Sequence, residues 1–219
     1  MKNGLLLFIG VFSAVALSWA ILILTGFHTF GNLRPYVDDI TGDTFPSPMT
    51  GLAEKGRGVY AELGCVACHT QQVRRPGFGV DHLRGWGDRQ SVGRDYIGQH
   101  QVYIGDFRIG PDLRNVGERD VPDFDWETWH HLHLYNPRMM VPGSLMPAFP
   151  FLYEKREIVG QPSSRALPLD VGEGYEVVPT ERAVALVGYL RNQRIDYDLP
   201  EAQDLTVEAW ERRNEQQPE

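Results

Sequence analysis

The only cysteines of the chain stand together in the segment Cys65-Val66-Ala67-Cys68-His69. Two thiols separated by two residues and followed directly by a histidine are the attachment pattern of a c-type haem. Each thiol can add across one vinyl group of the porphyrin, and the imidazole of His69 is then held beneath the iron. The spacing is tight because both thioethers and the histidine must meet one flat macrocycle within a single turn of chain. The segment therefore predicts one covalent haem c, bound through Cys65 and Cys68 with His69 as proximal ligand.

Two other chemistries use a similar cysteine pair. A structural zinc ion takes four Cys or His ligands, usually as two spaced pairs, and the sequence has no second cysteine pair. A redox-active dithiol of the thioredoxin kind stands near a βαβ pattern, which the sequence does not show. The haem interpretation is therefore favoured over both.

A haem iron with one histidine has either an open site or a second axial ligand, and this choice separates a catalyst from an electron carrier. Met146 is the favoured second ligand, because Pro147 restrains its backbone toward an extended conformation that suits a loop presenting sulfur to iron. Met139 and Met140 are weaker candidates. The alternative for any methionine is to fill a gap in the core, its usual role.

Two further residues are candidates for the surroundings of the haem. A ligating histidine normally donates its other ring N–H to an acceptor, and the carbonyl of Pro111 in Gly110-Pro111-Asp112-Leu113 is a candidate for His69. A plain turn is the alternative for that segment. Arg108 is a candidate to neutralise a haem propionate, with a solvated surface arginine as the alternative.

Three histidines, His130, His131 and His133, stand close together in the sequence. On a helix, His130 and His133 share a face only partly, and no carboxylate motif accompanies them. We therefore expect surface or interface histidines here rather than a metal site.

The elements that position these residues begin with a membrane span. No charged residue occurs from Gly4 to Gly26, and about 20 apolar residues suffice for a helix to cross the hydrocarbon core. A cleavable signal peptide is the alternative, but the apolar run is longer than a typical signal-peptide core. We expect an anchor over residues 1–27 with its N-terminus in the cytoplasm, as Lys2 favours.

The rest of the chain predicts a mainly α fold: a class I-like cytochrome c domain over residues 51–199, with long loop insertions. A linker over 28–50 precedes this domain and a tail over 200–219 follows it. An apolar face from Leu52 to Leu63 indicates a helix before the haem motif, and Gly56 on that face would let another helix approach closely. Thr180 is the expected N-cap of a late partner helix, and Asp125 that of a helix reaching about Tyr135. Stretches 74–107 and 152–178 read as long loops, and no strand pattern is persuasive.

The formal net charge of −8 and the lack of a basic cluster argue against nucleic acid as a partner. An acidic surface is compatible with docking a positively charged electron-transfer protein, although charge alone names no partner.

The chain resembles subunit II, the monohaem subunit, of cbb3-type cytochrome c oxidases. The resemblance rests on five segments: Gly64–Arg74 with the haem motif, Arg108–Leu113, Trp129–Arg138, Ser144–Leu152 and Tyr175–Thr180. It departs from the family at Ile109, where threonine is usual, at Arg75, and in the loop from Phe78 to Gln101.

The resemblance implies that Cys65, Cys68, His69 and Met146 are the haem cysteines, proximal histidine and distal methionine. It also implies a single-pass subunit of the bacterial inner membrane, with its haem domain on the periplasmic side beside a large catalytic subunit. Electrons would come from a dihaem cytochrome subunit or a soluble cytochrome c and pass to the haem–copper centre that reduces oxygen. The chain by itself would then be a redox subunit and not an enzyme.

Two other functions fit a membrane anchor followed by one haem. The first is the cytochrome c subunit of a related nitric oxide reductase. The second is a stand-alone tethered cytochrome, serving as a shuttle or, with an open axial site, as a sensor.

Overall fold

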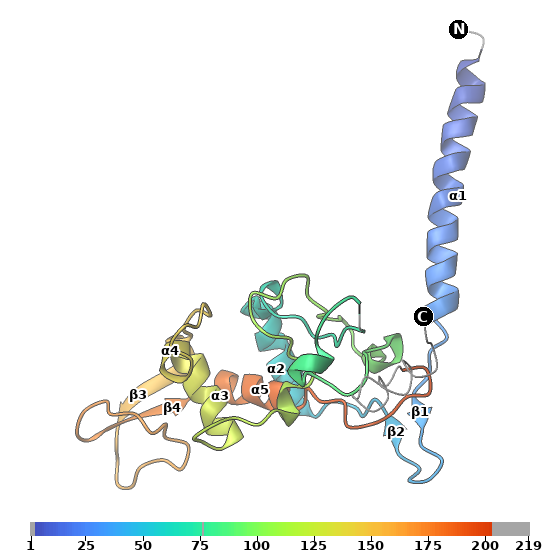
Figure 1. The fold of residues 1–219 in the computed structure, drawn as a ribbon. Coiled ribbons are helices and arrows are strands. Elements are labelled where there is room, and N and C mark those ends of the chain that lie inside the picture. Colours follow the sequence, from blue (N-terminus) through green and yellow to red (C-terminus); the bar gives the residue numbers. More distant parts are fainter. Residues whose placement is uncertain (1–2, 76, 203–219) are drawn as a thin grey trace. The chain divides into compact units, whose positions relative to one another are not determined.

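The computed structural model describes residues 3–75 and 77–202, and the chain divides into two compact units (Figure 1). The first unit is Met1–Ser47 with Val92–Gln99, and the second is Pro48–Ser91 with His100–Glu219. Each unit is described by itself.

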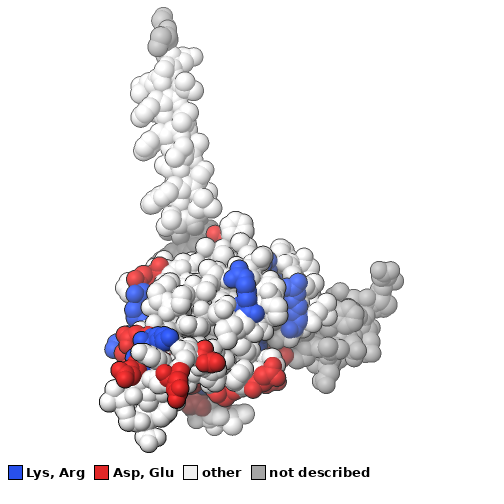
Figure 2. Space-filling view, turned by 90° about the vertical axis from the view of Figure 1, so that its left-hand side faces the viewer, with Lys and Arg blue, Asp and Glu red and all other residues white. Residues whose placement is uncertain are grey.

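The first unit contains the long apolar helix α1, Gly4–Phe30. By length and composition this helix can cross a membrane, and none of its residues is buried within the chain. On the face seen in Figure 2, this helix shows no Lys, Arg, Asp or Glu side chain. It continues to Phe30, into the segment expected to be a linker. The unit also holds the short antiparallel pair β1, Tyr36–Val37, and β2, Thr44–Phe45, and the 3₁₀ turn Gly93–Tyr96.

The second unit is built around two helices that cross, α2 (Gly51–Glu62) and α5 (Glu181–Arg191). Thr50 and Thr180 cap their N-termini, each accepting a hydrogen bond from a backbone N–H in the first turn. A Cβ atom on Gly56 would lie 1.8 Å from the carbonyl oxygen of Ala185. The close crossing predicted at Gly56 is therefore confirmed, because any side chain there would collide with α5.

The third helix of this unit is α3, Trp126–Tyr135, whose N-cap Asp125 accepts hydrogen bonds from the N–H groups of Glu127 and Thr128. This confirms the predicted capping and extent of the helix. The short helix α4 (Pro137–Met140) follows, and Leu132 and Leu134 of α3 join the core formed by α2 and α5. The haem motif enters this unit directly after α2, so it is fixed at the edge of the core.

The expectation of a strandless fold was wrong at both ends of the stretch 152–178. Strand β3, Tyr153–Glu157, pairs antiparallel with β4, Tyr175–Pro179. In β3 only Tyr153 is buried, so no alternation of apolar residues marks the strand. The partner strand follows a long connection, so no tight-turn signal marks a hairpin either.

Candidate haem site

The haem motif lies on a tight turn at the end of α2. Gly64 adopts a left-handed conformation (φ 71°) and starts the 3₁₀ turn Cys65–Ala67. The backbone N–H of His69 donates to the Cys65 carbonyl at 3.0 Å, so the two residues lie one turn apart. Both cysteines are free thiols and partly exposed. Burial raises the pKa of the Cys65 thiol to about 11, which keeps it protonated near neutral pH. The turn therefore offers two thiols and one imidazole from a single short segment.

The imidazole of His69 is oriented from the other side by residues 110–111. Its Nδ1 lies 2.7 Å from the carbonyl oxygen of Pro111. A carbonyl only accepts, so Nδ1 carries the donated proton and a neutral ring keeps its Nε2 lone pair free for a metal. Burial lowers the pKa of His69, opposed by the Pro111 hydrogen bond, and this favours the neutral ring. The Pro111 carbonyl is thus the acceptor for His69 Nδ1, and its role beside a bound haem stays a prediction.

Gly110 makes room for this ring. A Cβ atom at Gly110 would lie 2.3 Å from Cε1 and 2.8 Å from Nε2 of His69. The Gly110 N–H donates to the carbonyl of Cys68 at 3.0 Å, which ties the two segments together beside the ring. The absence of a side chain at residue 110 is therefore a requirement of the His69 position.

Arg108 is neither a solvated surface arginine nor an isolated charge. Its guanidinium forms an ion pair with buried Asp81 and donates from Nε to the hydroxyl of Thr70 at 2.7 Å. The prediction that Arg108 neutralises a haem propionate stays a prediction.

The loop carrying Met146 is held more loosely. Met146 is partly buried against the hydrophobic core, and its N–H donates to the Ser144 hydroxyl at 3.2 Å. The neighbouring Leu145 is 78% exposed. Met140 also packs partly against the core, whereas Met139 is exposed. Ligation by Met146 stays a prediction.

Two of the three histidines of α3 differ from the expectation of surface or interface residues, whereas His133 is partly exposed. His130 and His131 are buried, and burial lowers the pKa of each to about 4. His130 contacts the Trp126 carbonyl through Nδ1 at 2.8 Å, and His131 Nδ1 lies 3.1 Å from the Tyr153 hydroxyl. Within residues 3–75 and 77–202, no group of three His, Cys, Asp or Glu side chains could hold a metal ion. The helical pattern did not predict this burial, because it depends on contacts with residues distant in the sequence, such as that of His131 with Tyr153.

Among the buried side-chain atoms without a hydrogen-bond partner in the described residues, four test whether a haem fits here. They are Nε and Nη2 of Arg119, Nε1 of Trp129 and Nδ1 of His133. Burial lowers the pKa of His69 most, and the nearby charge of Arg119 lowers it further. Burial likewise lowers the pKa of His133 most, and the charge of His69 adds to that effect. Trp129 stacks on His133 with ring centroids 4.7 Å apart. All three side chains therefore belong to the surroundings of the proximal histidine.

Buried donors without partners are costly unless a ligand satisfies them. A haem carries two carboxylates, which accept hydrogen bonds from arginine and from ring N–H groups. The residues present thus fit the group. Sequence reasoning gave neither Arg119 nor Trp129 a role at the haem. Arg119 lies outside the motifs, and Trp129 begins the segment Trp129–Arg138 without a pattern that marks its contacts.

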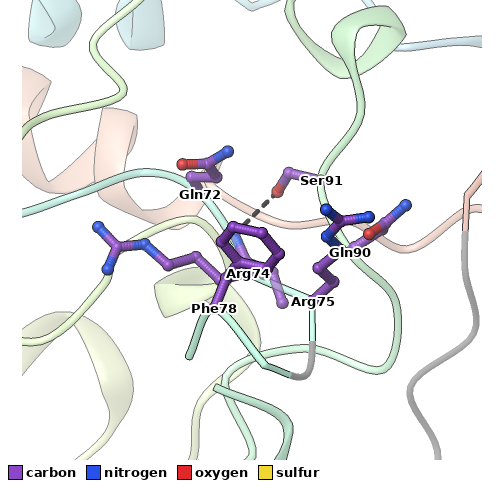
Figure 3. Close-up of a pocket in the computed structure, with 7 residues that line it drawn as sticks. Gln72, Arg74, Arg75, Phe78, Gln90 and Ser91 are labelled. Carbon is purple, nitrogen blue, oxygen red and sulfur yellow. Dashed lines mark hydrogen bonds between the residues drawn. The ribbon is translucent and has the colours of Figure 1, made fainter. Parts of the chain in front are cut away.

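A cavity of about 330 Å³ lies beside the segment that follows the motif (Figure 3). It is lined by Gln72, Arg74, Arg75, Phe78, Gln90 and Ser91. The Ser91 hydroxyl accepts a hydrogen bond from the N–H of Val73. Arg75 stacks on Phe78 at 4.4 Å. The lining includes none of the predicted haem residues, so this cavity is separate from the haem site.

The chain thus combines a c-type haem attachment motif with one helix long and apolar enough to cross a membrane. Residues 1–196 match the family described as cytochrome c oxidase, mono-heme subunit/FixO. The chain belongs to this family, the monohaem cytochrome c subunits of cbb3-type oxidases. No curated protein matches the chain.

Proposed function

We propose that this chain relays electrons to the catalytic subunit of a cbb3-type oxidase through one haem c bound at Cys65, Cys68 and His69. The observation that carries the proposal is the orientation of His69, whose Nδ1 is committed to the Pro111 carbonyl 2.7 Å away while Nε2 is left for iron. A haem bound here would supply reversible one-electron chemistry at its iron.

The residues of the chain divide the work of holding such a group. Cys65 and Cys68 would form the thioether bonds, and His69 and Met146 would coordinate the iron. Arg119, Trp129 and His133 would receive the haem carboxylates, because their buried nitrogens have no hydrogen-bond partner among the described residues. With two side chains bound to the iron, this chain would offer no site for oxygen, so reduction of oxygen would fall to the partner subunit.

The anchor helix α1 would keep the haem domain beside that partner. We place the domain on the periplasmic side of a bacterial inner membrane, since haem attachment to this motif takes place outside the cytoplasm. The immediate donor would be a dihaem cytochrome subunit or a soluble cytochrome c.

The test is purification of the native complex, followed by rapid mixing of its reduced form with oxygen. We expect the haem of this chain to become oxidised within the turnover time of the complex. The isolated chain should consume no oxygen. A complex that turns over nitric oxide and not oxygen would contradict the proposal, as would a chain that purifies without any large membrane subunit.

A further inference from the structure

Arg108 makes a set of contacts that a surface arginine does not make. Its side chain is only 16% exposed, and all three guanidinium nitrogens are engaged. Nε donates to the Thr70 hydroxyl at 2.7 Å, and Nη2 donates to the Gln72 carbonyl at 2.7 Å. Nη1 and Nη2 each donate a hydrogen bond to one oxygen of the Asp81 carboxylate, and the Asp81 side chain is 1% exposed. Such a two-pronged arginine–carboxylate pair is strong and directional.

Asp112 completes the cluster from the segment that carries Pro111. Its carboxylate is fully buried and accepts from the Thr70 hydroxyl at 2.6 Å and from the Gln72 N–H at 2.7 Å. Arg108 Nη2 lies 3.5 Å from this same oxygen, Oδ2, whereas Oδ1 accepts from the N–H of Arg114 at 2.9 Å. The side chains of Arg108, Asp81 and Asp112 therefore join residues 70–72, directly after the haem motif, to residues 108–114.

Pro111 lies within the second of these two segments, residues 108–114. It has no backbone N–H, so it cannot donate a hydrogen bond that would fix its own position. Backbone hydrogen bonds flank it on both sides: Gly110 donates to Cys68 at 3.0 Å, and Leu113 donates to Thr70 at 2.7 Å. The position of the Pro111 carbonyl therefore depends on how firmly the two segments are held together.

We propose that Arg108 is a positioning residue for the proximal histidine. Through Asp81, Thr70 and Asp112 it holds the Pro111 carbonyl against His69 Nδ1. The strength of that hydrogen bond sets how basic the imidazole is toward a bound metal, and so tunes the metal. This inference rests on the proposed haem function, and it gives Arg108 a role different from neutralising a propionate.

The experiment uses the full-length, haem-loaded chain with ¹⁵N-labelled histidine, in its reduced state. Two quantities are measured: the hydrogen-exchange rate of the His69 Nδ1 proton by NMR, and the reduction potential. The variants are Arg108→Lys, Thr70→Val and the double change Arg108→Gln with Asp81→Asn. All three keep the net charge of the cluster, so a change in long-range charge cannot produce the result.

We expect each variant to speed Nδ1 proton exchange about tenfold, the size expected for loss of one charge-assisted hydrogen bond. The reduction potential should rise, because a weaker Nδ1 hydrogen bond makes His69 a poorer donor to oxidised iron. Arg156→Gln is the matched control, since it breaks the Arg156–Glu176 ion pair between β3 and β4, and it should leave both quantities unchanged.

An unchanged exchange rate in Arg108→Lys would overturn the proposal. Lysine keeps the positive charge but cannot donate two parallel N–H hydrogen bonds to a carboxylate as the guanidinium does. A shifted potential with unchanged exchange would instead support contact with a propionate and equally overturn it. If the arginine variants fail to fold, Thr70→Val alone tests the proposal. An unchanged exchange rate of the His69 Nδ1 proton in that variant would then refute the positioning role of Arg108. Failure of the proposed function looks different: the unsubstituted chain then carries no covalent haem.

Discussion

The two sides of the candidate haem site are built differently. On the His69 side, side-chain and backbone hydrogen bonds join residues 68–72 to residues 108–114, and the carboxylates of Asp81 and Asp112 are buried. On the Met146 side, a short loop after α4 is held by Ser144 and by the Phe149 N–H, which donates to Leu134 at 2.9 Å. A densely bonded segment opens at a higher free-energy cost than a loop with few contacts. The proposed proximal ligand His69 is therefore held between two joined segments, whereas the proposed distal ligand Met146 lies in a loop with fewer side-chain hydrogen bonds.

The largest effect is expected at the attachment cysteines. Changing both Cys65 and Cys68 to alanine removes both sites for thioether bonds, so no covalent haem should remain. Haem staining of the denatured chain measures this directly. Arg156→Gln serves as the control and should stain like the unsubstituted chain. Staining retained in the double variant would refute the assignment of the motif.

A pair of glycine substitutions compares the two sides directly. Gly110→Ala places a Cβ atom 2.3 Å from Cε1 of His69. The backbone hydrogen bonds from Gly110 to Cys68 and from Leu113 to Thr70 hinder the two segments from moving apart. Overpacking of this kind costs about 3 kcal/mol of unfolding free energy. Gly143→Ala, in the Met146 loop, meets nothing within 4 Å.

Thermal or chemical unfolding of the two loaded variants measures the difference. Gly143→Ala should stay within about 0.5 kcal/mol of the original chain, as surface substitutions usually do. Equal losses from both variants would contradict the view that the His69 side is the tightly packed one.

Met146→Ala tests the looser side. Removing a thioether ligand should lower the reduction potential by on the order of 0.1 V, since axial ligands set haem potentials over about 0.8 V. That change corresponds to about 2.3 kcal/mol. The haem should stay attached through Cys65 and Cys68.

The absorption band that a methionine ligand gives to oxidised haem should disappear in this variant. Met139→Ala is the matched control, because Met139 is exposed and on the neighbouring helix. If the band persists in Met146→Ala, the distal ligand is another residue.

The remaining prediction concerns the pH dependence of stability. Burial lowers the pKa of His131 from an ordinary value of 6.5 to about 4 in the folded chain. Between these values the unfolded chain binds a proton that the folded chain does not, so stability is full above pH 6.5 and falls as the pH drops toward 4. The slope for one such histidine reaches about 1.4 kcal/mol per pH unit.

His131→Gln should therefore flatten the pH dependence of the unfolding free energy in this window. His82→Gln, on a 3₁₀ turn outside α3, is the control. An unchanged slope in His131→Gln would show that His131 does not supply the acid sensitivity.

The haem interpretation, the anchor helix and the helix starts at Asp125 and Thr180 could be predicted because each is encoded in a short segment. Asp125 and Thr180 cap their helices through N–H groups two or three residues away. The pair β3–β4 could not be predicted, because β3 exposes four of its five residues and its partner strand is distant in the sequence. The burial of His130 and His131 could not be predicted either, since it depends on contacts with residues distant in the sequence, such as that of His131 with Tyr153.

The sequence by itself determined which chemistry the chain can carry: two thiols and a histidine within one turn can hold a haem whatever the rest of the fold does. Only the tertiary structure decided how that histidine is held. The contacts of His69 with Pro111 and of Thr70 with Asp112 each join residues 42 positions apart. The proposed positioning role of Arg108 likewise depends on folding, because only folding brings Asp81 and Thr70 into contact with its guanidinium. Local spacing encodes the ligands, whereas a buried network exists only once distant segments have met and water has left.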